Sequence, residues 1–343
     1  MRAAFALTLL ASAAAWPAAA AGTGTLEAFG DWVVGCDNAM ACTAIGLSPD
    51  MAPVFAYLKV TREAGAESGP LVSVTILDEL QAGGPIRLSL EGGTLPVQTL
   101  EPEEDGSFAS AELGPVDHAA FLHALLPGAT LDVSIGEETV PVSLDGMSAA
   151  LRYMDAAQER AGSSGAIVAR GERPADTIPG PSPLSTVTAV ELTAVDVPAE
   201  RPEGLPERDE FCPEGGEDSV YRAPDGTLIW GVCTSAGAYN LFEDFSIVKD
   251  GIARLADLGP QGTAIGPDEL ETGSTLVNAG LAEDGRTIQA FARGRGLGDC
   301  GSITSWVFDG QDLVLVEEAA MGECRGVMPD DWPVLYRAET AGD

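Results

Sequence analysis

The sequence has few of the residues that enzymes use most often for acid–base and phosphate chemistry. Only two histidines, His118 and His123, and two lysines, Lys59 and Lys249, occur in 343 residues. Acidic residues number 53 against 18 basic ones, so the formal net charge is −35. Such a chain repels nucleic-acid phosphates and anionic lipid, and we expect no nucleic-acid partner. A solvated surface is the simplest explanation of the charge, and a basic partner or a divalent cation is the alternative.

Neither histidine belongs to a recognisable catalytic or metal-binding pattern. His118 and His123 would lie about 140° apart around a helix, so one helix cannot direct both at one metal ion. Asp117, next to His118, is explained by a helix N-cap. Cys-x-x-Cys and EF-hand spacings are absent, although the acidic run at residues 101–105 could bind calcium weakly. We predict no metal site, no cofactor and no enzymatic activity.

The N-terminal segment has the composition of a secretory signal peptide. Met1-Arg2 provides a positive start, residues 3–16 are almost all apolar, and residues 17–21 supply small side chains at the spacing of a cleavage site. The apolar run is too short for a membrane span, which needs about 20 residues, and no later run is long enough. We therefore predict cleavage after residue 20 or 21 and a periplasmic or secreted mature protein with no membrane span.

Six cysteines follow the signal peptide, and an even number in an exported chain indicates disulfide bonds. In two cases a pair of cysteines brackets an apolar strand, an Asp-Gly turn and a second apolar strand, which is a strong hairpin pattern. A third pair encloses a short polar loop. Spacing does not exclude other connectivities, but these patterns favour the pairs Cys36–Cys42, Cys212–Cys233 and Cys300–Cys324.

The distribution of strand and turn patterns predicts a mostly β protein with two antiparallel β domains, each sandwich- or barrel-like, and one or two short helices. The first domain is expected at residues 22–165, with a helix near 117–126 and a terminal helix at 147–160. Residues 166–210 contain seven prolines between positions 174 and 206 and are predicted to be a linker with a possible edge strand. The C-terminal, disulfide-stapled domain is expected at residues 211–343.

Two glycine-rich segments match the residue spacing of enzyme motifs but lack the structural context that those motifs require. Residues 296–301, GLGDCG, match the dinucleotide-binding pattern, but an apolar strand follows where that pattern requires a helix. Residues 322–326, GECRG, mimic a nucleophile elbow, but no histidine occurs after position 123. We expect the first segment to be a tight loop at the base of a hairpin.

Part of the N-terminal half resembles the invasion-associated locus B family, which consists of small exported β proteins of alphaproteobacteria. The resemblance is carried by FGDWVVGC at residues 29–36, by Cys42, by LPGATL at residues 126–131, and by VSLDGM at residues 142–147 with AAL at 149–151. It covers residues 22 to about 160. The usual pattern of that family has an additional cysteine pair in the middle of the domain, which this chain lacks.

The whole chain resembles a bacterial family catalogued as domain of unknown function 1176, whose members are exported proteins of this length with six cysteines. The motifs that carry this resemblance are GAYN at residues 237–240, GLGDCG at 296–301, Trp306 with Asp309-Gly310, CRG at 324–326 and Trp332-Pro333. The resemblance implies a compartment and an architecture but no established activity. The motif residues Trp306, Tyr239, Asn240, Asp299 and Arg325 have either an interaction role or a structural role.

Three functions fit these observations. The first is a non-catalytic binding or interaction module of the cell envelope, with a protein partner. The second is an acidic inhibitor of a basic envelope-active enzyme such as a lysozyme, because opposite charges favour that association. The third is an envelope glycan hydrolase that uses a carboxylate pair, which requires a cleft with two carboxyl groups about 5–9.5 Å apart.

Overall fold

The computed structural model describes residues 24–341, apart from residues 51, 53, 78–83, 91–97, 101–102, 106–107, 115–116, 214–216 and 259–272. The predicted signal peptide lies outside the described residues, and so do the side chains of the acidic run at 101–105. No helix in the described part of the chain is long and apolar enough to cross a membrane.

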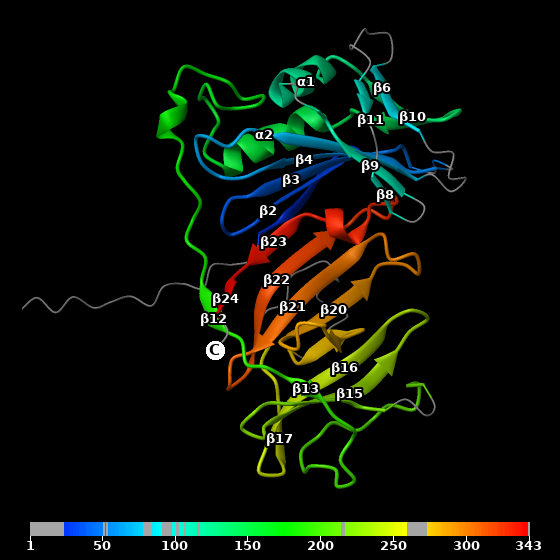
Figure 1. The fold of residues 1–343 in the computed structure, drawn as a ribbon, viewed down its shortest axis with the longest axis vertical. Coiled ribbons are helices and arrows are strands. Elements are labelled where there is room, and N and C mark those ends of the chain that lie inside the picture. Colours follow the sequence, from blue (N-terminus) through cyan, green and yellow to red (C-terminus); the bar gives the residue numbers. More distant parts are fainter. Residues whose placement is uncertain are drawn as a thin grey trace, which may run out of the picture.

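The protein is mostly β, as predicted, and two β-rich halves are stacked along the long axis of the molecule (Figure 1). Every strand pairing within the four larger sheets is antiparallel. None of the sheets formed by the described strands closes into a barrel, which excludes the barrel-like alternative.

The N-terminal half contains a seven-stranded sheet and a four-stranded sheet, with the orders β1-β2-β3-β4-β5-β9-β8 and β11-β10-β6-β7. The strands of the larger sheet are β1 (Leu26–Phe29), β2 (Trp32–Cys36), β3 (Cys42–Leu47), β4 (Ala56–Arg62), β5 (Leu71–Leu77), β8 (Glu103–Asp105) and β9 (Phe108–Glu112). Those of the smaller sheet are β6 (Ile86–Leu90), β7 (Gln98–Leu100), β10 (Thr130–Ile135) and β11 (Glu138–Ser143).

The core of this half lies between the two sheets and two helices, because alternate residues of the central strands point inward and are apolar. On β4, for example, Leu58 and Val60 are fully buried in this core, whereas Lys59 and Thr61 point to the opposite face. Helix α1 (His118–Leu125) begins at its predicted N-cap, since the Ala120 N–H donates to Asp117 Oδ1 at 3.0 Å.

Helix α2 (Met147–Ala157) lies against the N-terminal core through Met147, Leu151 and Met154, as its apolar spacing indicates. It ends three residues before the predicted end at Arg160. Glu159 has a positive φ of 53°, and the Arg160 guanidinium turns back to donate to the carbonyls of Glu63 and Gly65. The predicted end was three residues too far, because the left-handed backbone conformation of Glu159 does not continue an α-helix.

The C-terminal half contains a sheet of order β13-β14-β15-β16-β17, with β18 also paired to β16, and a sheet of order β19-β20-β21-β22-β23. The strands of the first are β13 (Thr193–Ala194), β14 (Ser219–Arg222), β15 (Leu228–Ala236), β16 (Leu241–Lys249), β17 (Ile252–Leu255) and β18 (Thr275–Val277). Those of the second are β19 (Gly280–Leu281), β20 (Thr287–Arg293), β21 (Gly301–Phe308), β22 (Leu313–Met321) and β23 (Val334–Arg337).

The proline-rich stretch runs along one side of the molecule from the upper half to the lower half (Figure 1). It contains the 3₁₀ turn η1 (Ala175–Thr177) and two short strands. Strand β12 (Thr186–Thr188) pairs in parallel with β24 (Glu339–Ala341), and β13 is an edge strand beside β14. The β-prone middle of the stretch thus contributes strand pairings to the C-terminal half.

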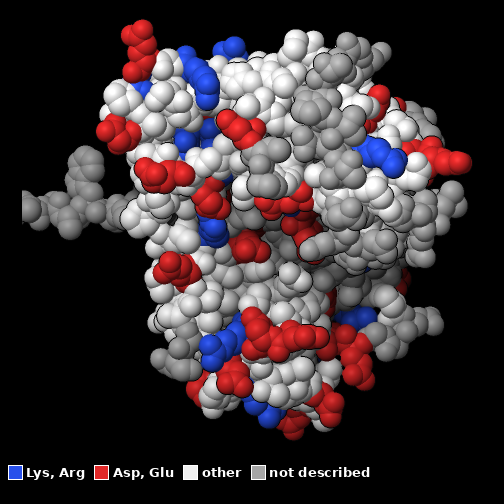
Figure 2. Space-filling model, turned by 45° about the horizontal axis from the view of Figure 1, so that its top comes forward, with Lys and Arg blue, Asp and Glu red and all other residues white. Residues whose placement is uncertain are grey.

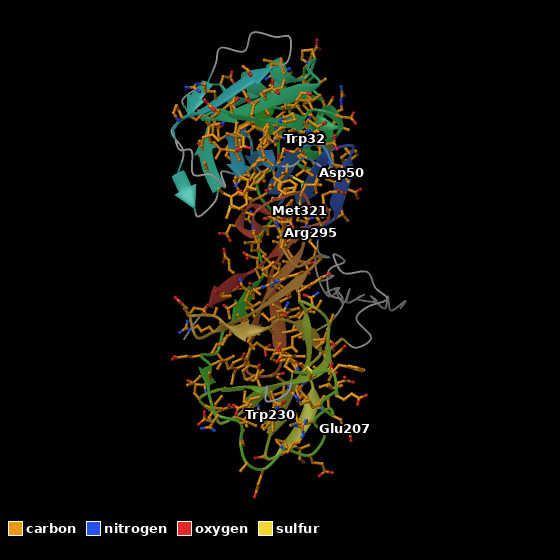
Figure 3. The ribbon with its side chains drawn as sticks, turned by 90° about the vertical axis from the view of Figure 1, so that its right-hand side faces the viewer. Trp32, Asp50, Glu207, Trp230, Arg295 and Met321 are labelled. Carbon is orange, nitrogen blue, oxygen red and sulfur yellow. A yellow bond between two sulfur atoms is a disulfide. The ribbon has the colours of Figure 1, made fainter. Side chains whose placement is uncertain are left out.

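The two halves meet through an apolar interface between their large sheets. The outward face of β2 and β3 supplies Val33 and Ile45, and the facing sheet supplies Ala319 and Met321 from β22. Trp332, which follows the 3₁₀ turn η2 (Pro329–Asp331), packs edge-on against Phe291 with ring centroids 5.7 Å apart. Figure 3 labels Met321 at the height of this junction. The seven-stranded sheet is therefore covered on both faces over β2 and β3.

Candidate functional site

Two loops and one strand end of the C-terminal half form a connected cluster at the junction with the N-terminal half. The loops are residues 237–240, between β15 and β16, and residues 294–300, between β20 and β21; the third segment is residues 322–326, after β22. We call these three segments the loop cluster. It contains four of the five residues that the family motifs singled out, namely Tyr239, Asn240, Asp299 and Arg325.

The two loops are held together by hydrogen bonds to backbone groups. The Asn240 amide donates to the Arg293 carbonyl at 3.0 Å and accepts from the Arg293 N–H at 3.1 Å. Asn278 donates to Asn240 Oδ1 at 3.0 Å and to the Phe291 carbonyl at 2.8 Å. The Tyr239 hydroxyl donates to the Gly294 carbonyl at 3.2 Å. Asn240 therefore fixes the relative position of the two loops.

Glycines allow residues 294–300 to turn sharply against the Cys300–Cys324 disulfide. A Cβ atom at Gly294 would lie 2.8 Å from Cys300 Sγ, and one at Gly301, where φ is 133°, would lie 2.0 Å from the Ala292 carbonyl oxygen. Strand β21 starts at Gly301, so no helix follows the glycines. The segment is the tight hairpin-base loop expected from the sequence.

The disulfide and a backbone hydrogen bond to Asp299 connect the loop to residues 322–326. Arg295 Nε donates to Asp299 Oδ1 at 2.7 Å, and the Gly326 N–H donates to Asp299 Oδ2 at 2.7 Å. Burial alone would raise the pKa of Asp299, but the hydrogen bonds from Arg295 and Gly326 hold it below its ordinary value. Asp299 is thus an ionised internal link between two segments of the loop cluster.

Arg325 joins the loop cluster to the N-terminal half. Its Nη1 lies 2.6 Å from Asp31 Oδ1, in the turn between β1 and β2, and its Nη2 lies 3.5 Å from Glu323 Oε2. Although burial opposes it, hydrogen bonds from Ser143 and Arg325 lower the pKa of Asp31. The Arg325 side chain is only 15% exposed, and its ion pair with Asp31 links the two halves of the molecule.

Two large hydrophobic side chains of the loop cluster are exposed to solvent. Leu297 is 75% exposed and Tyr239 is 40% exposed, and the Tyr239 ring lies beside the backbone of Gly296. Figure 3 labels Arg295, two residues before Leu297, at the height of the junction between the halves. The family motifs did not point to Leu297 as a candidate residue. Its position between two glycines in a tight loop is nevertheless a signal that the side chain stays exposed.

Trp306 is the one motif residue that lies outside the loop cluster. It is 1% exposed in the core between the two C-terminal sheets, and its Nε1–H donates to Thr304 Oγ1 at 2.9 Å. Trp32, Trp230 and Trp332 are also buried. The structure therefore gives these four tryptophan rings a role in core packing.

The histidines lie far from the loop cluster, on α1 in the N-terminal half. His118 Nδ1 accepts from the Val72 N–H at 3.0 Å, and its Nε2 is 3.2 Å from the Leu113 carbonyl oxygen. Both contacts hold α1 on the sheet. In the part of the chain that the structure describes, no group of three or more potential metal-binding side chains occurs.

The three disulfides are Cys36–Cys42, Cys212–Cys233 and Cys300–Cys324, and the described residues include no free cysteine. These are the pairs that the hairpin and loop patterns favour. Cys36 and Cys42 face each other on adjacent strands, whereas Cys212 links the end of the proline-rich stretch to β15. Each of the three disulfides therefore cross-links a different region of the chain.

A family model described as "Protein of unknown function (DUF1176)" matches residues 26–339. The chain belongs to this family. It is 30% identical over 361 residues to "Uncharacterized protein YpfG" of Escherichia coli (strain K12), with 97% of each chain covered. The family relationship expected from the motifs is thus confirmed, and with it the extent of the relationship along nearly the whole chain.

Among solved structures, the chain is similar to invasion associated protein B from Bartonella henselae. The match has a TM-score of 0.30 and 19% sequence identity, and it covers 39% of this chain and 99% of that chain.

Proposed function

We propose that this protein is a periplasmic interaction module without catalytic activity, and that it binds a protein partner through the loop cluster. The observation that carries the proposal is the pair Tyr239 and Leu297, whose side chains are solvent-exposed on loops that a disulfide and several hydrogen bonds hold in place. Exposed aromatic and aliphatic anchors on a preorganised surface lose little conformational entropy on binding.

The periplasmic location is supported by the three disulfide bonds, which persist in oxidising compartments, and by the predicted signal peptide. The absence of catalytic activity remains a proposal. It is supported by the roles of His118, which holds α1, and of Asp299 and Arg325, which are occupied by internal ion pairs.

The net charge favours a partner that is basic overall. Acidic side chains are widespread on the face that Figure 2 shows, with basic ones scattered among them. Long-range attraction of this kind raises association rates and is screened by salt, whereas apolar anchors set the dissociation rate. We therefore expect binding to the loop cluster to be faster at low ionic strength.

The experiment compares partner capture by the oxidised mature protein and by two single variants. Leu297→Ser removes the most exposed anchor of the loop cluster. Ile252→Ser is the matched control, because Ile252 is 65% exposed and lies beyond the far end of β16, about 30 Å of strand away. Each protein is immobilised and exposed to a periplasmic extract of its host at low and moderate salt.

A stoichiometric protein that wild type and Ile252→Ser retain, and Leu297→Ser loses, supports the proposal. Capture that is the same for all three proteins, or no stoichiometric protein at either salt concentration, contradicts it.

A basic envelope-active enzyme, such as a lysozyme, is the second candidate partner, because the charge of −35 complements a cationic protein. Calorimetric titration with a cationic lysozyme tests it directly. Salt-sensitive binding and inhibition support this candidate, and the absence of binding at low salt removes it.

A further inference from the structure

A polar groove lies on the outward face of the seven-stranded sheet, away from the loop cluster. It has a volume of about 410 Å³ and is lined by residues of β4, β5 and β9 and by Asp331 of the C-terminal half. On the inward face of the same strands, Val60, Val72 and Ala111 are buried in the N-terminal core. The groove is thus built on a rigid, fully packed support.

Strand register arranges the groove side chains in rows. Lys59 on β4 faces Ser73 on β5, which faces Glu112 on β9. Neighbouring strands lie about 4.8 Å apart, so Lys59 and Glu112 flank Ser73 from either side.

The neighbouring row, about 7 Å along the strands, is Tyr57, Thr75 and Ser110, and the row on the other side pairs Thr61 with Leu71. Thr75 Oγ1 and Ser110 Oγ are 2.9 Å apart and share a hydrogen bond. Thr75 is buried beneath the groove, so the hydroxyl groups that line its accessible floor are those of Thr61, Ser73 and Ser110.

The C-terminal half provides one wall. Asp331, at the end of η2, accepts hydrogen bonds from the Lys59 ammonium and the Tyr57 hydroxyl. Burial and the adjacent Asp331 carboxylate raise the pKa of Tyr57 above its ordinary value, so the phenol keeps its proton and its donor role. The wall that Asp331 forms is therefore present only where the two halves are docked.

The charges of the groove select against anionic ligands. Its only ammonium group among the described lining residues, Lys59, is neutralised by Asp331, and Glu112 adds a negative charge. With a net charge of −35 on the chain, a phosphate or another polyanion would be repelled.

Apolar ligands do not fit either, because the partly exposed lining residues include Thr61, Ser73 and Ser110. Each hydroxyl can both donate and accept, which suits a ligand with many hydroxyl groups of its own. Leu71, which is 52% exposed at the rim, offers an apolar contact for the C–H face of a sugar ring.

We propose that this groove binds a neutral oligosaccharide. The hydroxyl rows of β4, β5 and β9 make the polar contacts, Glu112 and Asp331 accept from sugar hydroxyls, and Leu71 packs against a ring. The site is separate from the loop cluster, and its occupation requires the docked arrangement of the two halves.

The probes are neutral tetrasaccharides of glucose, galactose, mannose and N-acetylglucosamine, with an acidic tetrasaccharide that contains uronate as the counter-probe. Binding to the full mature protein is measured by calorimetry and by chemical-shift changes. Ser73→Val replaces the central hydroxyl by a group suited to a strand. Ser134→Val, on β10 outside the groove, is the matched control.

We expect saturable binding of at least one neutral tetrasaccharide, weakened at least tenfold by Ser73→Val and unchanged by Ser134→Val. Leu297→Ser should leave this binding unchanged, which separates it from the partner site of the loop cluster. The inference is overturned if no neutral tetrasaccharide binds at millimolar concentration, if the acidic probe binds more tightly, or if Ser73→Val binds as wild type does.

Discussion

Glu318 on β22 is a buried carboxyl group in the C-terminal half, and replacing it should change how stability depends on pH. The residue is 0% exposed, and neither carboxyl oxygen has a hydrogen-bond partner among the residues that the structure describes. Its strand neighbours are Thr304 on β21 and Tyr336 on β23. Burial raises the pKa of Glu318 from 4.5 to about 7. Glu318→Gln removes this titration and keeps the size of the side chain.

The direction in which pH changes the stability follows from the pKa values of Glu318 in the unfolded and in the folded chain. Below pH 4.5 both the folded and the unfolded chain carry the proton, and the group has no effect. As the pH rises from there to about 7, the unfolded chain loses the proton first, so folding becomes less favourable. Above that pH the full cost is present, and at about 1.4 kcal/mol per pKa unit it amounts to about 3 kcal/mol.

Urea unfolding at several pH values between 5 and 8 measures this cost. Relative to wild type, Glu318→Gln should gain about 2–3 kcal/mol of unfolding free energy across that interval. Glu317→Gln, the exposed neighbour on the same strand, is the control and should follow wild type. If the curves of Glu318→Gln and wild type run parallel, the carboxyl group is not the buried, unpartnered acid described above.

Three further changes test the packing. Arg62→Met should cost about 3–5 kcal/mol in denaturant unfolding, because it leaves Asp155, the other member of a fully buried ion pair, without its cation. Replacing Cys300 and Cys324 by serine should cost about 2–4 kcal/mol and speed hydrogen exchange in the loop cluster. Gly146→Ala should lower the melting temperature sharply, with a loss of at least about 2 kcal/mol, since φ is 90° and the new Cβ would lie 1.6 Å from a backbone oxygen.

Local patterns could predict much of the β structure. The Asp-Gly turns work because Gly226 and Gly310 adopt positive φ values of 87° and 97°, which favour glycine. The apolar runs on either side then pair as β14 with β15 and β21 with β22. The N-cap at Asp117 is a similarly local signal, because its partner N–H is three residues away.

Non-local contacts could not be predicted from local sequence patterns. Lys59 and Asp331 are separated by 272 positions and meet only because η2 lies over the outward face of β4. No local sequence pattern therefore predicted the groove. The family motifs did locate the loop cluster, but they pointed to residues that build it, such as Asn240 and Asp299, and not to the exposed Leu297.

The most direct test of the interaction proposal is site-specific photo-cross-linking in the living host. A photoreactive amino acid is placed at position 297 in the loop cluster and, in a separate strain, at position 252, which is similarly exposed at the far end of the C-terminal half. The proposal predicts one discrete protein adduct from position 297 and none of that size from position 252. The same adduct from both positions, or no adduct from position 297, would contradict it.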